Sequence, residues 1–359
     1  MKADTRVRPV LAADIGGTKI LAALVSRDGQ VLAKERRPTL AEDGPQAVIN
    51  RLFAAFDSLL SQPFDFAPST SLRTGQGKQK IEPSQLHAIS VACAGGIDDA
   101  RGVVTTSPNL PGWIDIPLRD AVRDRFKVTT YLLNDSSAAA LGEYRFGAGK
   151  GTRNFIMLTV GTGIGGGIII EGKLYNGAAG SAGELGHMTI DVNGPLCNCG
   201  NTGCLEALAS GKAMARLAKR RIIQGEKSAL VEMLAGKVDN ITAEQIGIAA
   251  RNGDKLASEV ISDIATYLGV GMVNLVNIFN PEVLAVAGGV AKLGDLLMEP
   301  ARRIVKERAF PISARTVKIV TARLGDEAGV LGAAVFAFRP RPSRKVSKEA
   351  VCQTQSGLL

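Results

Sequence analysis

Aromatic residues and histidines are scarce in this chain of 359 residues, which has 4% aromatics and only two histidines. Its Lys and Arg residues give a net charge of +9, but they are scattered along the chain. Nucleic-acid-binding proteins usually cluster their basic residues, often beside aromatic side chains that stack on bases. The composition therefore argues against a nucleic-acid partner, and anionic small molecules or thermal adaptation explain the excess charge as well.

Long apolar runs are also missing. No stretch approaches the ~20 apolar residues of a membrane span, and the N-terminus MKADTRVRPV has no apolar signal-peptide core. Five cysteines, three of them within eight positions, do not form the pattern of a disulfide framework. We therefore expect a cytoplasmic protein with no membrane partner.

Glycine, in contrast, is abundant, with 41 residues, many of them in short runs. The run in DIGGTK lies between predicted strands at 10–17 and 19–26. The run in VGTGIGGG joins NFIMLTVGTG (154–163), a predicted strand with a glycine turn at its end, to a predicted hairpin at 165–175. Strand, glycine-rich turn, second strand and hairpin recur in the same order, which predicts a distant internal duplication. We expect two α/β domains that face each other across a cleft.

Hydrophobic periodicity predicts the remaining elements. The expected helices cover 44–60, 254–280, 292–308 and 328–338, and further strands cover 30–38, 86–96, 128–133 and 282–290. Residues 61–84 are polar and rich in Ser, Gln and Pro, which indicates a long surface loop or a local insertion. The predicted division is a small N-terminal domain over 1–135, a larger domain over 136–325, a helix at 326–338 that packs back on the first domain, and a disordered tail over 339–359.

The two glycine-rich turns suit a polyphosphate. Glycine lets backbone N–H groups approach phosphate oxygens, so one turn in each domain predicts two clamps on one phosphate chain. Neither turn is a Walker sequence, and each alone could be an ordinary tight turn. Asp14, beside the first turn, is placed to hold a hydrated magnesium ion or, alternatively, to cap the turn. The residues assigned to this nucleotide site are Asp14, Gly16, Gly17, Thr18, Lys19, Gly161, Thr162 and Gly163.

Asp135 follows Asn134 and the predicted strand at 128–133, at the start of a predicted helix. A carboxylate at that point can serve as the N-cap of the helix. In a phosphoryl-transfer cleft it can instead accept the proton of the hydroxyl group that attacks the γ-phosphate. The local sequence leaves both roles open.

Three cysteines stand close together in GPLCNCGNTGCLE (194–206): Cys197, Cys199 and Cys204. His187, ten residues upstream of Cys197, can supply a fourth ligand. Three thiolates and one imidazole complete a tetrahedral zinc site with no open position, so the metal would be structural. A disulfide is the alternative, but Cys-x-Cys is a poor spacing for one, and a disulfide would leave an odd thiol.

Two acidic residues flank the predicted metal ligands. Glu184 precedes His187 by three residues, and Glu206 follows Cys204 by two. A zinc ion would therefore hold both carboxylates near one point, where they could accept hydrogen bonds from the hydroxyl groups of a polyol. Ordinary surface carboxylates are the alternative.

Five segments resemble the ROK family of sugar kinases and sugar-responsive repressors, and the likeness is closest to bacterial glucokinases. They are DIGGTK (14–19), NDSSAAALGE (134–143), GTGIGGGI (161–168), GELGHM (183–188) and CNCGNTGCLE (197–206). The likeness covers about residues 9–338. It implies an actin-like, ribonuclease-H-like α/β fold of two domains with a cleft between them. It also implies ATP, Mg²⁺ and structural Zn²⁺ as cofactors. The segment 61–84 is longer than the family pattern requires.

The resemblance also implies roles for single residues. Asp135 would be the catalytic base, and ATP would lie between the turns at 14–19 and 161–167. Gly288 and Gly289 would form the turn beside the adenine nucleotide. The zinc ligands would be His187, Cys197, Cys199 and Cys204. The sugar-binding positions would be Gly95, Asn109, Asn134, Asp135, Glu184, His187 and Glu206.

The resulting hypothesis is an ATP-dependent hexose kinase that acts on the 6-hydroxyl group. Likeness around GAAGSAGELGHM favours glucose over N-acetylmannosamine and fructose as substrate. A repressor of the family would carry a helix-turn-helix domain ahead of the first turn, and the 13 residues before Asp14 are too few for one. A zinc-ribbon binding module would leave both phosphate turns and Asp135 unexplained. Kinases of this family are typically oligomers, and the apolar helix at 257–279 offers surface for a homodimer or homotetramer.

Overall fold

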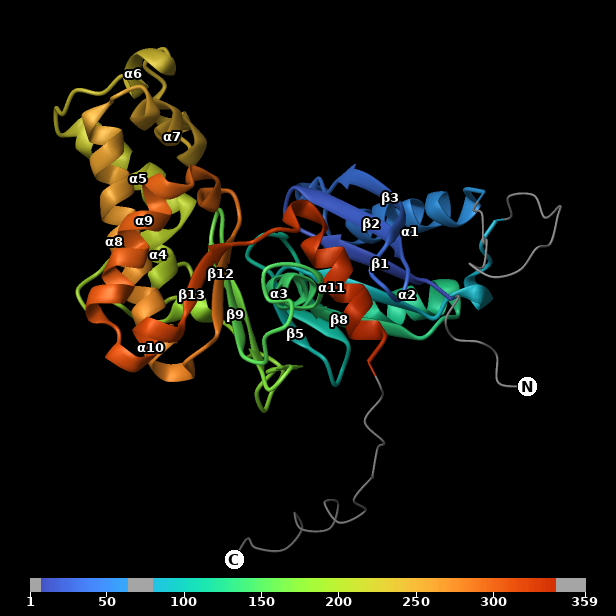
Figure 1. Cartoon of the computed structure of the whole chain (residues 1–359). Coiled ribbons are helices and arrows are strands. Elements are labelled where there is room, and N and C mark those ends of the chain that lie inside the picture. Colours follow the sequence, from blue (N-terminus) through green and yellow to red (C-terminus); the bar gives the residue numbers. More distant parts are fainter. Residues whose placement is uncertain (1–7, 64–79, 340–359) are drawn as a thin grey trace, which may run out of the picture.

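The computed structural model describes residues 8–63 and 80–339, and its two parts are each built on a mixed five-stranded sheet (Figure 1). The strand order is β3-β2-β1-β4-β8 in the first sheet and β11-β10-β9-β12-β13 in the second. In both sheets the central strand pairs antiparallel with the strand that follows it and parallel with a later one. The repeated strand order confirms the duplication that the two glycine-rich segments predicted.

The strands lie close to the predicted positions. The first sheet has β1 Val10–Ile15, β2 Lys19–Val25, β3 Val31–Pro38, β4 Ala88–Cys93 and β8 Thr130–Asn134. The second sheet has β9 Phe155–Val160, β10 Ile164–Ile170, β11 Lys173–Leu174, β12 Val283–Ala287 and β13 Lys318–Thr321.

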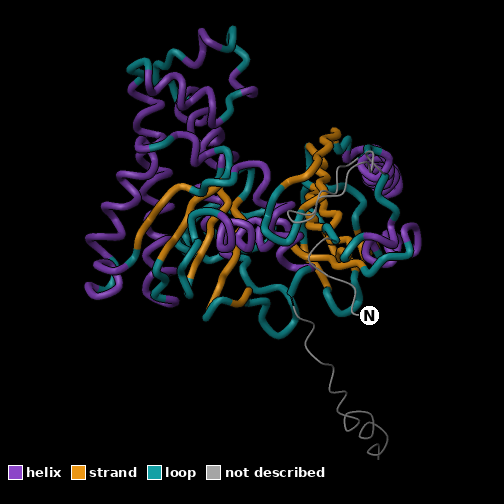
Figure 2. Tube along the Cα trace, turned by 45° about the vertical axis from the view of Figure 1, so that its right-hand side comes forward, coloured by secondary structure: helices purple, strands orange, loops and turns teal. Residues whose placement is uncertain are grey.

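Side chains alternate along the strands and so divide the interior into layers. On β1, Leu11 belongs to a core shared with α1 (Pro45–Ser61), on the outer face of the first sheet. Ala12, the next residue, belongs to a middle core shared with α3 (Asp135–Phe146) and α11 (Ala328–Ala337). Figures 1 and 2 show these two helices between the two sheets.

The second sheet repeats this alternation. Phe155 of β9 belongs to the middle core, and Ile156 belongs to a third core that lies against the long helix α8 (Lys255–Phe279). The helices α3 and α11 touch backbone to backbone, since a Cβ atom on Gly332 would overlap the carbonyl oxygen of Ala138. The remaining helices are α2 Leu118–Phe126, α4 Leu205–Ala209, α5 Gly211–Ile223, α6 Leu230–Met233, α7 Ala243–Arg251, α9 Asp295–Arg308 and α10 Pro311–Thr316.

A small third sheet was not predicted. Its strands are β5 (Gly96–Asp98), β6 (Val103–Thr106) and β7 (Ile114–Ile116), which pair antiparallel. These strands of three or four residues are too short to show an alternating pattern, and their pairing depends on the turns between them. The strand β13 and several helices were likewise not predicted: α2, α4, α5, α6, α7 and α10.

The helix α8 corresponds to the helix predicted at 254–280. Its first turn is capped by Asp254, whose carboxylate accepts a hydrogen bond from Ala257 N at 2.7 Å, and Asn280 ends it with a φ of 44°. By length and composition α8 could cross a membrane, so the expectation that no segment is apolar enough was wrong. However, 61% of its most apolar window is buried inside the protein. A buried core helix passes the same test, so α8 is weak evidence for a membrane span.

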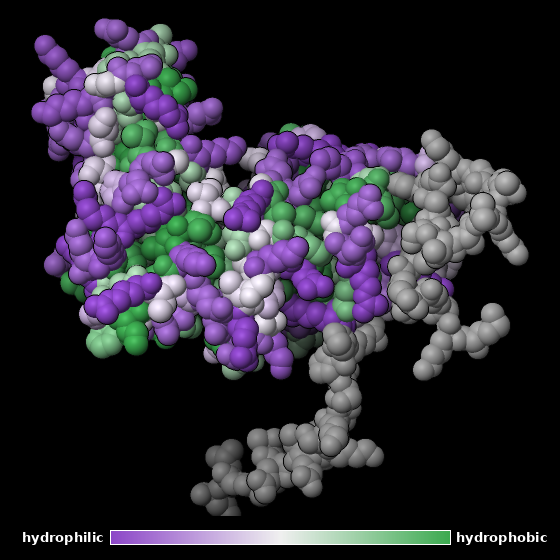
Figure 3. Space-filling view, viewed as in Figure 1, coloured by the Kyte–Doolittle hydropathy of each residue, from purple (hydrophilic) through white to green (hydrophobic). Residues whose placement is uncertain are grey.

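Much of α8 therefore packs inside its own chain and offers less oligomer surface than we expected. Exposed apolar side chains instead stand near its end and on the start of α10, where Ile278, Phe310 and Ile312 are each 67% exposed. Figure 3 shows hydrophobic surface next to polar surface near the position of α10 in Figure 1. Most of the predicted loop at 61–84 and nearly all of the predicted tail at 339–359 lie outside the described residues.

Candidate active site

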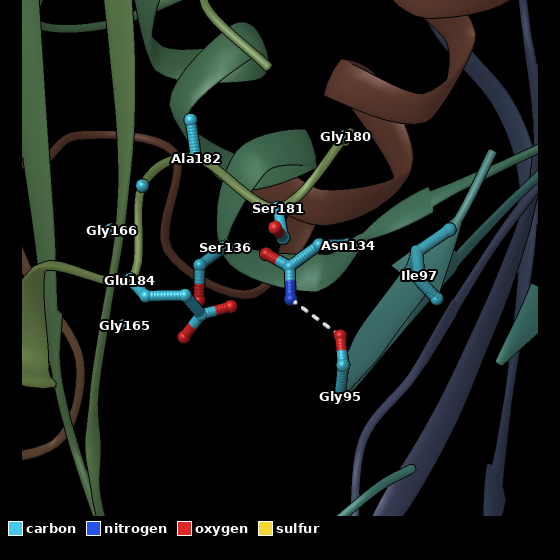
Figure 4. A pocket seen from close by; sticks show the side chains of 11 residues that line it. Gly95, Ile97, Asn134, Ser136, Gly165, Gly166, Gly180, Ser181, Ala182 and Glu184 are labelled. Carbon is cyan, nitrogen blue, oxygen red and sulfur yellow. Dashed lines mark hydrogen bonds between the residues drawn. The ribbon is translucent and has the colours of Figure 1, made fainter. Parts of the chain in front are cut away.

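The carboxyl ends of three parallel strands meet at one edge of the first sheet. Ile15 of β1 lies beside Cys93 of β4, which lies beside Asn134 of β8. Ligands of α/β proteins usually bind at such carboxyl ends. A cavity of about 320 Å³, including space open to solvent, lies here (Figure 4). Both sheets and the loop at 180–184 line it: Gly95, Ile97, Asn134, Ser136, Gly165, Gly166, Gly180, Ser181, Ala182, Gly183 and Glu184.

Asn134 joins the floor of this cavity to α3. Its Oδ1 accepts a hydrogen bond from Ser137 N at 3.0 Å, and its Nδ2 donates to the carbonyl oxygen of Gly95 at 3.1 Å (Figure 4). Gly95 has a φ of 118°, and a Cβ atom there would overlap the carbonyl oxygen of Thr106. Only glycine suits that position. Gly95 and Asn134 thus both line the cavity and shape it.

Asp135 is the first residue of α3 and is partly buried, between two residues that line the cavity, Asn134 and Ser136. The N-cap of this helix is Asn134, so the alternative that Asp135 is the helix cap was wrong. Asp135 Oδ1 accepts a hydrogen bond from Ser136 N at 2.8 Å. Burial raises the pKa of Asp135, and the hydrogen bonds from Ser136 partly offset that rise.

Asp14 lies on β1 within electrostatic reach of Asp135. Burial, helped by the negative charge of Asp135, raises the pKa of Asp14 to about 7, although Lys19 lowers it in part. The ammonium group of Lys19 itself pairs with Asp326 at 2.6 Å. A Cβ atom on Gly329, in the first turn of α11, would overlap the Asp14 carboxylate. The carboxylate is therefore enclosed by α11 on one side.

The first glycine-rich turn is held by Thr39. Within the turn, Gly16 N donates to the carbonyl oxygen of Lys19 at 2.9 Å. Thr39 Oγ1 donates to the carbonyl oxygen of Gly16 at 2.7 Å, and Thr39 N donates to that of Thr18 at 3.0 Å. These bonds from a fully buried threonine, rather than a cap from Asp14, fix the turn.

The second glycine-rich turn adjoins two other segments. Gly161 N donates to the carbonyl oxygen of Gly163 at 2.9 Å, and Gly211 N, at the start of α5, donates to that of Gly161 at 2.8 Å. Gly288 has a φ of 94°, and a Cβ atom there would overlap the carbonyl oxygen of Val160. The turns at 161–163 and 288–289 therefore lie together where the parallel strands β9 and β12 end.

Thr162 and Gly289 are exposed on these turns. The glycines that follow have another role. Gly165 and Gly167 lie in the strand β10, where Cβ atoms would overlap Ser136 and Ala140 of α3. The predicted phosphate turn at 161–167 is thus shorter than expected, because residues from 164 onward form a strand against which α3 packs.

Four possible metal ligands lie together, with ligand atoms all within 4.8 Å of one another. They are His187, Cys197, Cys199 and Cys204, which we call the metal group. The Sγ atoms of Cys199 and Cys204 are 3.7 Å apart, and Cys197 Sγ lies 3.7 Å from His187 Nδ1. Tetrahedral Zn–S bonds of about 2.3 Å would place two sulfurs about 3.8 Å apart. All three cysteines are free thiols, against the disulfide alternative. The donor set and its spacing fit zinc.

The two glutamates near this group differ in position. Glu184 lines the cavity, and burial raises the pKa of its carboxyl group. Glu206 Oε2 accepts a hydrogen bond from Ile164 N at 2.7 Å, and its Oε1 lies 3.9 Å from Cys197 Sγ. Glu206 therefore links the metal group to the second glycine-rich turn. Neither Glu206 nor His187 is among the residues that line the cavity.

Asn109 lies against the first glycine-rich turn, since a Cβ atom on Gly17 would stand 2.9 Å from the carbonyl oxygen of Asn109. Three residues of the site were not predicted from the sequence: Ser136, Thr39 and Gly211. Ser136 directly follows Asp135 and could have been found from that neighbour. Thr39 and Gly211 carry no local signal, because the segments they support are distant in the sequence.

Comparison with known proteins agrees with this architecture. The profile of the ROK family matches residues 76–339. A glucokinase of Thermotoga maritima is 36% identical over 328 residues, which cover 90% of this chain and 96% of that one. A xylose repressor of Caldicellulosiruptor bescii is 33% identical over 332 residues, covering 92% of this chain and 78% of the repressor.

Among solved structures, a ROK family glucokinase from Streptomyces griseus in complex with glucose and AMPPNP superposes with a TM-score of 0.75 at 35% identity. The superposition covers 91% of this chain and 98% of that one. This similarity confirms the predicted two-part, actin-like fold.

Proposed function

Because the chain belongs to the ROK family, we propose that it is an ATP-dependent kinase that transfers the γ-phosphoryl group to the 6-hydroxyl of glucose. The glucokinases that it matches at 36% identity are covered over 96% and 98% of their length. The xylose repressor is covered over 78% of its length, so the kinases share more of their length with this chain. ATP-dependent phosphorylation of glucose is therefore its function.

The observation that carries the mechanism is the partly buried Asp135 carboxylate between two residues that line the cavity, Asn134 and Ser136. An aspartate has an ordinary pKa of about 3.9, too low to remove a sugar hydroxyl proton in advance. Asp135 orients the hydroxyl and accepts its proton late, as the bond to phosphorus forms and the hydroxyl becomes more acidic. Burial favours this role because a raised pKa makes Asp135 a stronger base.

For the nucleotide, the turns at 16–19 and 161–163 would hold the phosphates through backbone N–H groups, and the adenosine would lie beside Gly288 and Gly289. Lys19 adds a positive charge. Asp14 fits a magnesium site, because a divalent cation would relieve the repulsion between its carboxylate and that of Asp135. When bound, Mg²⁺ neutralises charge on the phosphates.

For the sugar, Glu184 would accept hydrogen bonds from hydroxyl groups inside the cavity, beside Asn134. Asn109 lies against the first glycine-rich turn and is not among the residues that line the cavity. Zinc on the His187 group would be structural, because four protein ligands leave no position open for substrate. By holding its loop, the zinc would also hold Glu206.

We extend the proposal to the organisation of the chain. Residues 1–135 and the helix at 326–338 would form one domain and 136–325 the other, in keeping with the packing of α11 on β1 and β4. A homodimer or homotetramer in the cytoplasm, with no nucleic-acid or membrane partner, is the expected state. The exposed side chains of Ile278, Phe310 and Ile312 are candidates for contacts between copies.

Asp135→Asn tests the mechanism. The variant keeps the shape of the side chain but loses the proton acceptor, so kcat should fall by roughly 10²-fold or more while KM for glucose changes much less. Asp295→Asn is the matched control, because Asp295 is also the first residue of a helix but is exposed. Turnover of the Asp135→Asn variant near the wild-type rate would show that Asp135 is not the base.

A panel of hexoses and N-acetylhexosamines tests the substrate. We expect coupled ADP release to be fastest with glucose at equal, subsaturating concentrations. A higher kcat/KM for N-acetylmannosamine or fructose would replace glucose as the substrate without changing the role of Asp135.

A further inference from the structure

A second cavity has a volume of about 580 Å³, including space open to solvent. It shares no lining residue with the cavity of the candidate active site. It is bordered by the end of β2 and by the last turns of α3 and α11. We call it the arginine pocket, because Arg27, Arg145 and Arg339 line it together with Phe146 and Phe338. Its lining residues include no carboxylate.

Of the three arginines, Arg339 has the most unusual environment. Its Nη2 atom is buried and has no hydrogen-bond partner among the described residues. Burial also lowers the pKa of its guanidinium to about 10, and the group lies 4.6 Å above the ring of Phe336. A buried N–H group without an acceptor is costly, so one side of this guanidinium is left incompletely satisfied by the described residues.

The other two arginines are exposed at the mouth. The structure gives neither of them an ion pair within residues 8–63 and 80–339; Arg145 lies 6.0 Å from the ring of Phe146. That ring is fixed in place, because it packs directly against Gly29 in the turn between β2 and β3. Three arginines thus line one cavity whose wall also includes the packed ring of Phe146.

A purely structural role explains only part of this arrangement. Arg145 and Arg339 stand at the carboxyl ends of helices, where positive charge offsets the helix dipole. That role does not require a buried N–H group without an acceptor. It also does not explain Arg27, which comes from the end of a strand.

We propose that the arginine pocket binds a small phosphate monoester with an aromatic or apolar body. A dianionic phosphate matches several guanidinium forks better than a singly charged carboxylate does. The apolar part of the ligand would lie against Phe146, Phe338 and the neighbouring Val335. This site is independent of the glucose and ATP sites proposed above.

Calorimetric titration with phenyl phosphate tests the proposal, with the full chain saturated with glucose and AMPPNP so that the cleft is occupied. We expect one binding event per chain, with inorganic phosphate at least about ten-fold weaker because it has no apolar body. Arg145→Gln should weaken phenyl phosphate binding by about ten-fold or more. Arg123→Gln, another exposed helix arginine, should leave it unchanged.

Arg339→Gln should abolish binding, and Arg339→Lys should restore it only in part because lysine lacks the planar fork. Absence of binding to the wild-type chain at millimolar phenyl phosphate would overturn the proposal. So would unchanged affinity in Arg145→Gln, even if its melting temperature falls, since that result is expected from a helix-end role alone.

Discussion

At the scale of single residues, the most unusual feature is a pair of partly buried carboxyl groups, Asp14 and Asp135, at the carboxyl edge of the first sheet. Each has a raised pKa, and burial is the main cause in both cases. Neighbouring carboxylates that disfavour each other's charge are typical of sites that receive a cation or a proton. We therefore expect Asp14 to affect stability and metal binding, and Asp135 to affect catalysis.

Asp14 predicts a pH-dependent stability. Its pKa is raised from 3.8 to about 7 on folding, so between these values the folded chain keeps a proton that the unfolded chain has lost. The stabilisation from Asp14 is thus complete below pH 3.8 and is lost as pH rises through about 7. Thermal melts without Mg²⁺ should show wild-type stability declining, relative to Asp14→Asn, from pH 4.5 to 7.5. A difference that does not change with pH, as expected for the exposed-site control Asp295→Asn, would contradict this prediction.

Glu184 predicts a change in sugar affinity. Replacing its carboxylate with an amide weakens charge-assisted hydrogen bonds to sugar hydroxyls, each worth about 1.5–3 kcal/mol. Glu184→Gln should therefore raise KM for glucose by about ten-fold or more and lower kcat less. Steady-state kinetics with Glu171→Gln, an exposed glutamate outside the cavity, provides the control. A fall in kcat alone would place Glu184 with the reacting groups instead.

At the scale of elements, α3 connects the reaction site to the join between the two sheets. It begins with Asp135, crosses α11 at Gly142, and carries the fully buried Glu143 near its end. The Glu143 carboxylate accepts hydrogen bonds from Ala148 N at 2.8 Å and from the backbone N–H groups of residues 323 and 324 at 2.7 and 2.6 Å. Residues 323–324 lie on the segment that returns from β13 to α11, so Glu143 fixes α3 against that connection.

Glu143→Gln should therefore destabilise the chain. An amide leaves at least one of these backbone donors unsatisfied, and a lost hydrogen bond to a buried charged group costs about 1.5–3 kcal/mol. We expect the free energy of unfolding in urea to fall by that amount, with a matching loss of melting temperature. Glu299→Gln, on the exposed face of α9, should change it by less than about 0.5 kcal/mol. Equal stability of the two variants would show that the Glu143 contacts add little.

At the scale of the whole molecule, the metal group connects the second part of the chain to the cavity of the candidate active site. His187 follows Glu184 of the cavity wall, and Glu206 connects the group to the turn at 161–163. If zinc occupies this group as proposed, its removal should loosen sugar and nucleotide contacts together, without any direct contact between zinc and either ligand.

Cys199→Ser tests this coupling. We expect elemental analysis to give about one zinc per wild-type chain and substantially less in the variant, with a several-fold rise in KM for glucose. Cys93→Ala is the control for loss of a cysteine, because Cys93 is a free cysteine of β4 that lies outside the metal group. Freshly purified wild-type protein without zinc would exclude the metal assignment, and normal glucose kinetics in a zinc-free variant would exclude the coupling.

The sequence by itself determined the repeat of strand, glycine-rich turn and second strand, the long helix α8, and the grouping of His187 with three cysteines. Each of these depends on local information: alternation, helical periodicity, glycine runs or ligand spacing. The same local information could not separate Asn134 from Asp135 as helix cap, because both are good caps and only backbone geometry decides between them.

Only the tertiary structure decided which distant residues meet. Thr39 braces the first turn, Gly211 adjoins the second, and Glu143 holds a segment about 180 residues away. The short strands β5 to β7 and the arginine pocket also arise from contacts between distant segments. Such contacts leave no periodic signal, because a side chain that satisfies one remote backbone group needs no pattern among its own neighbours.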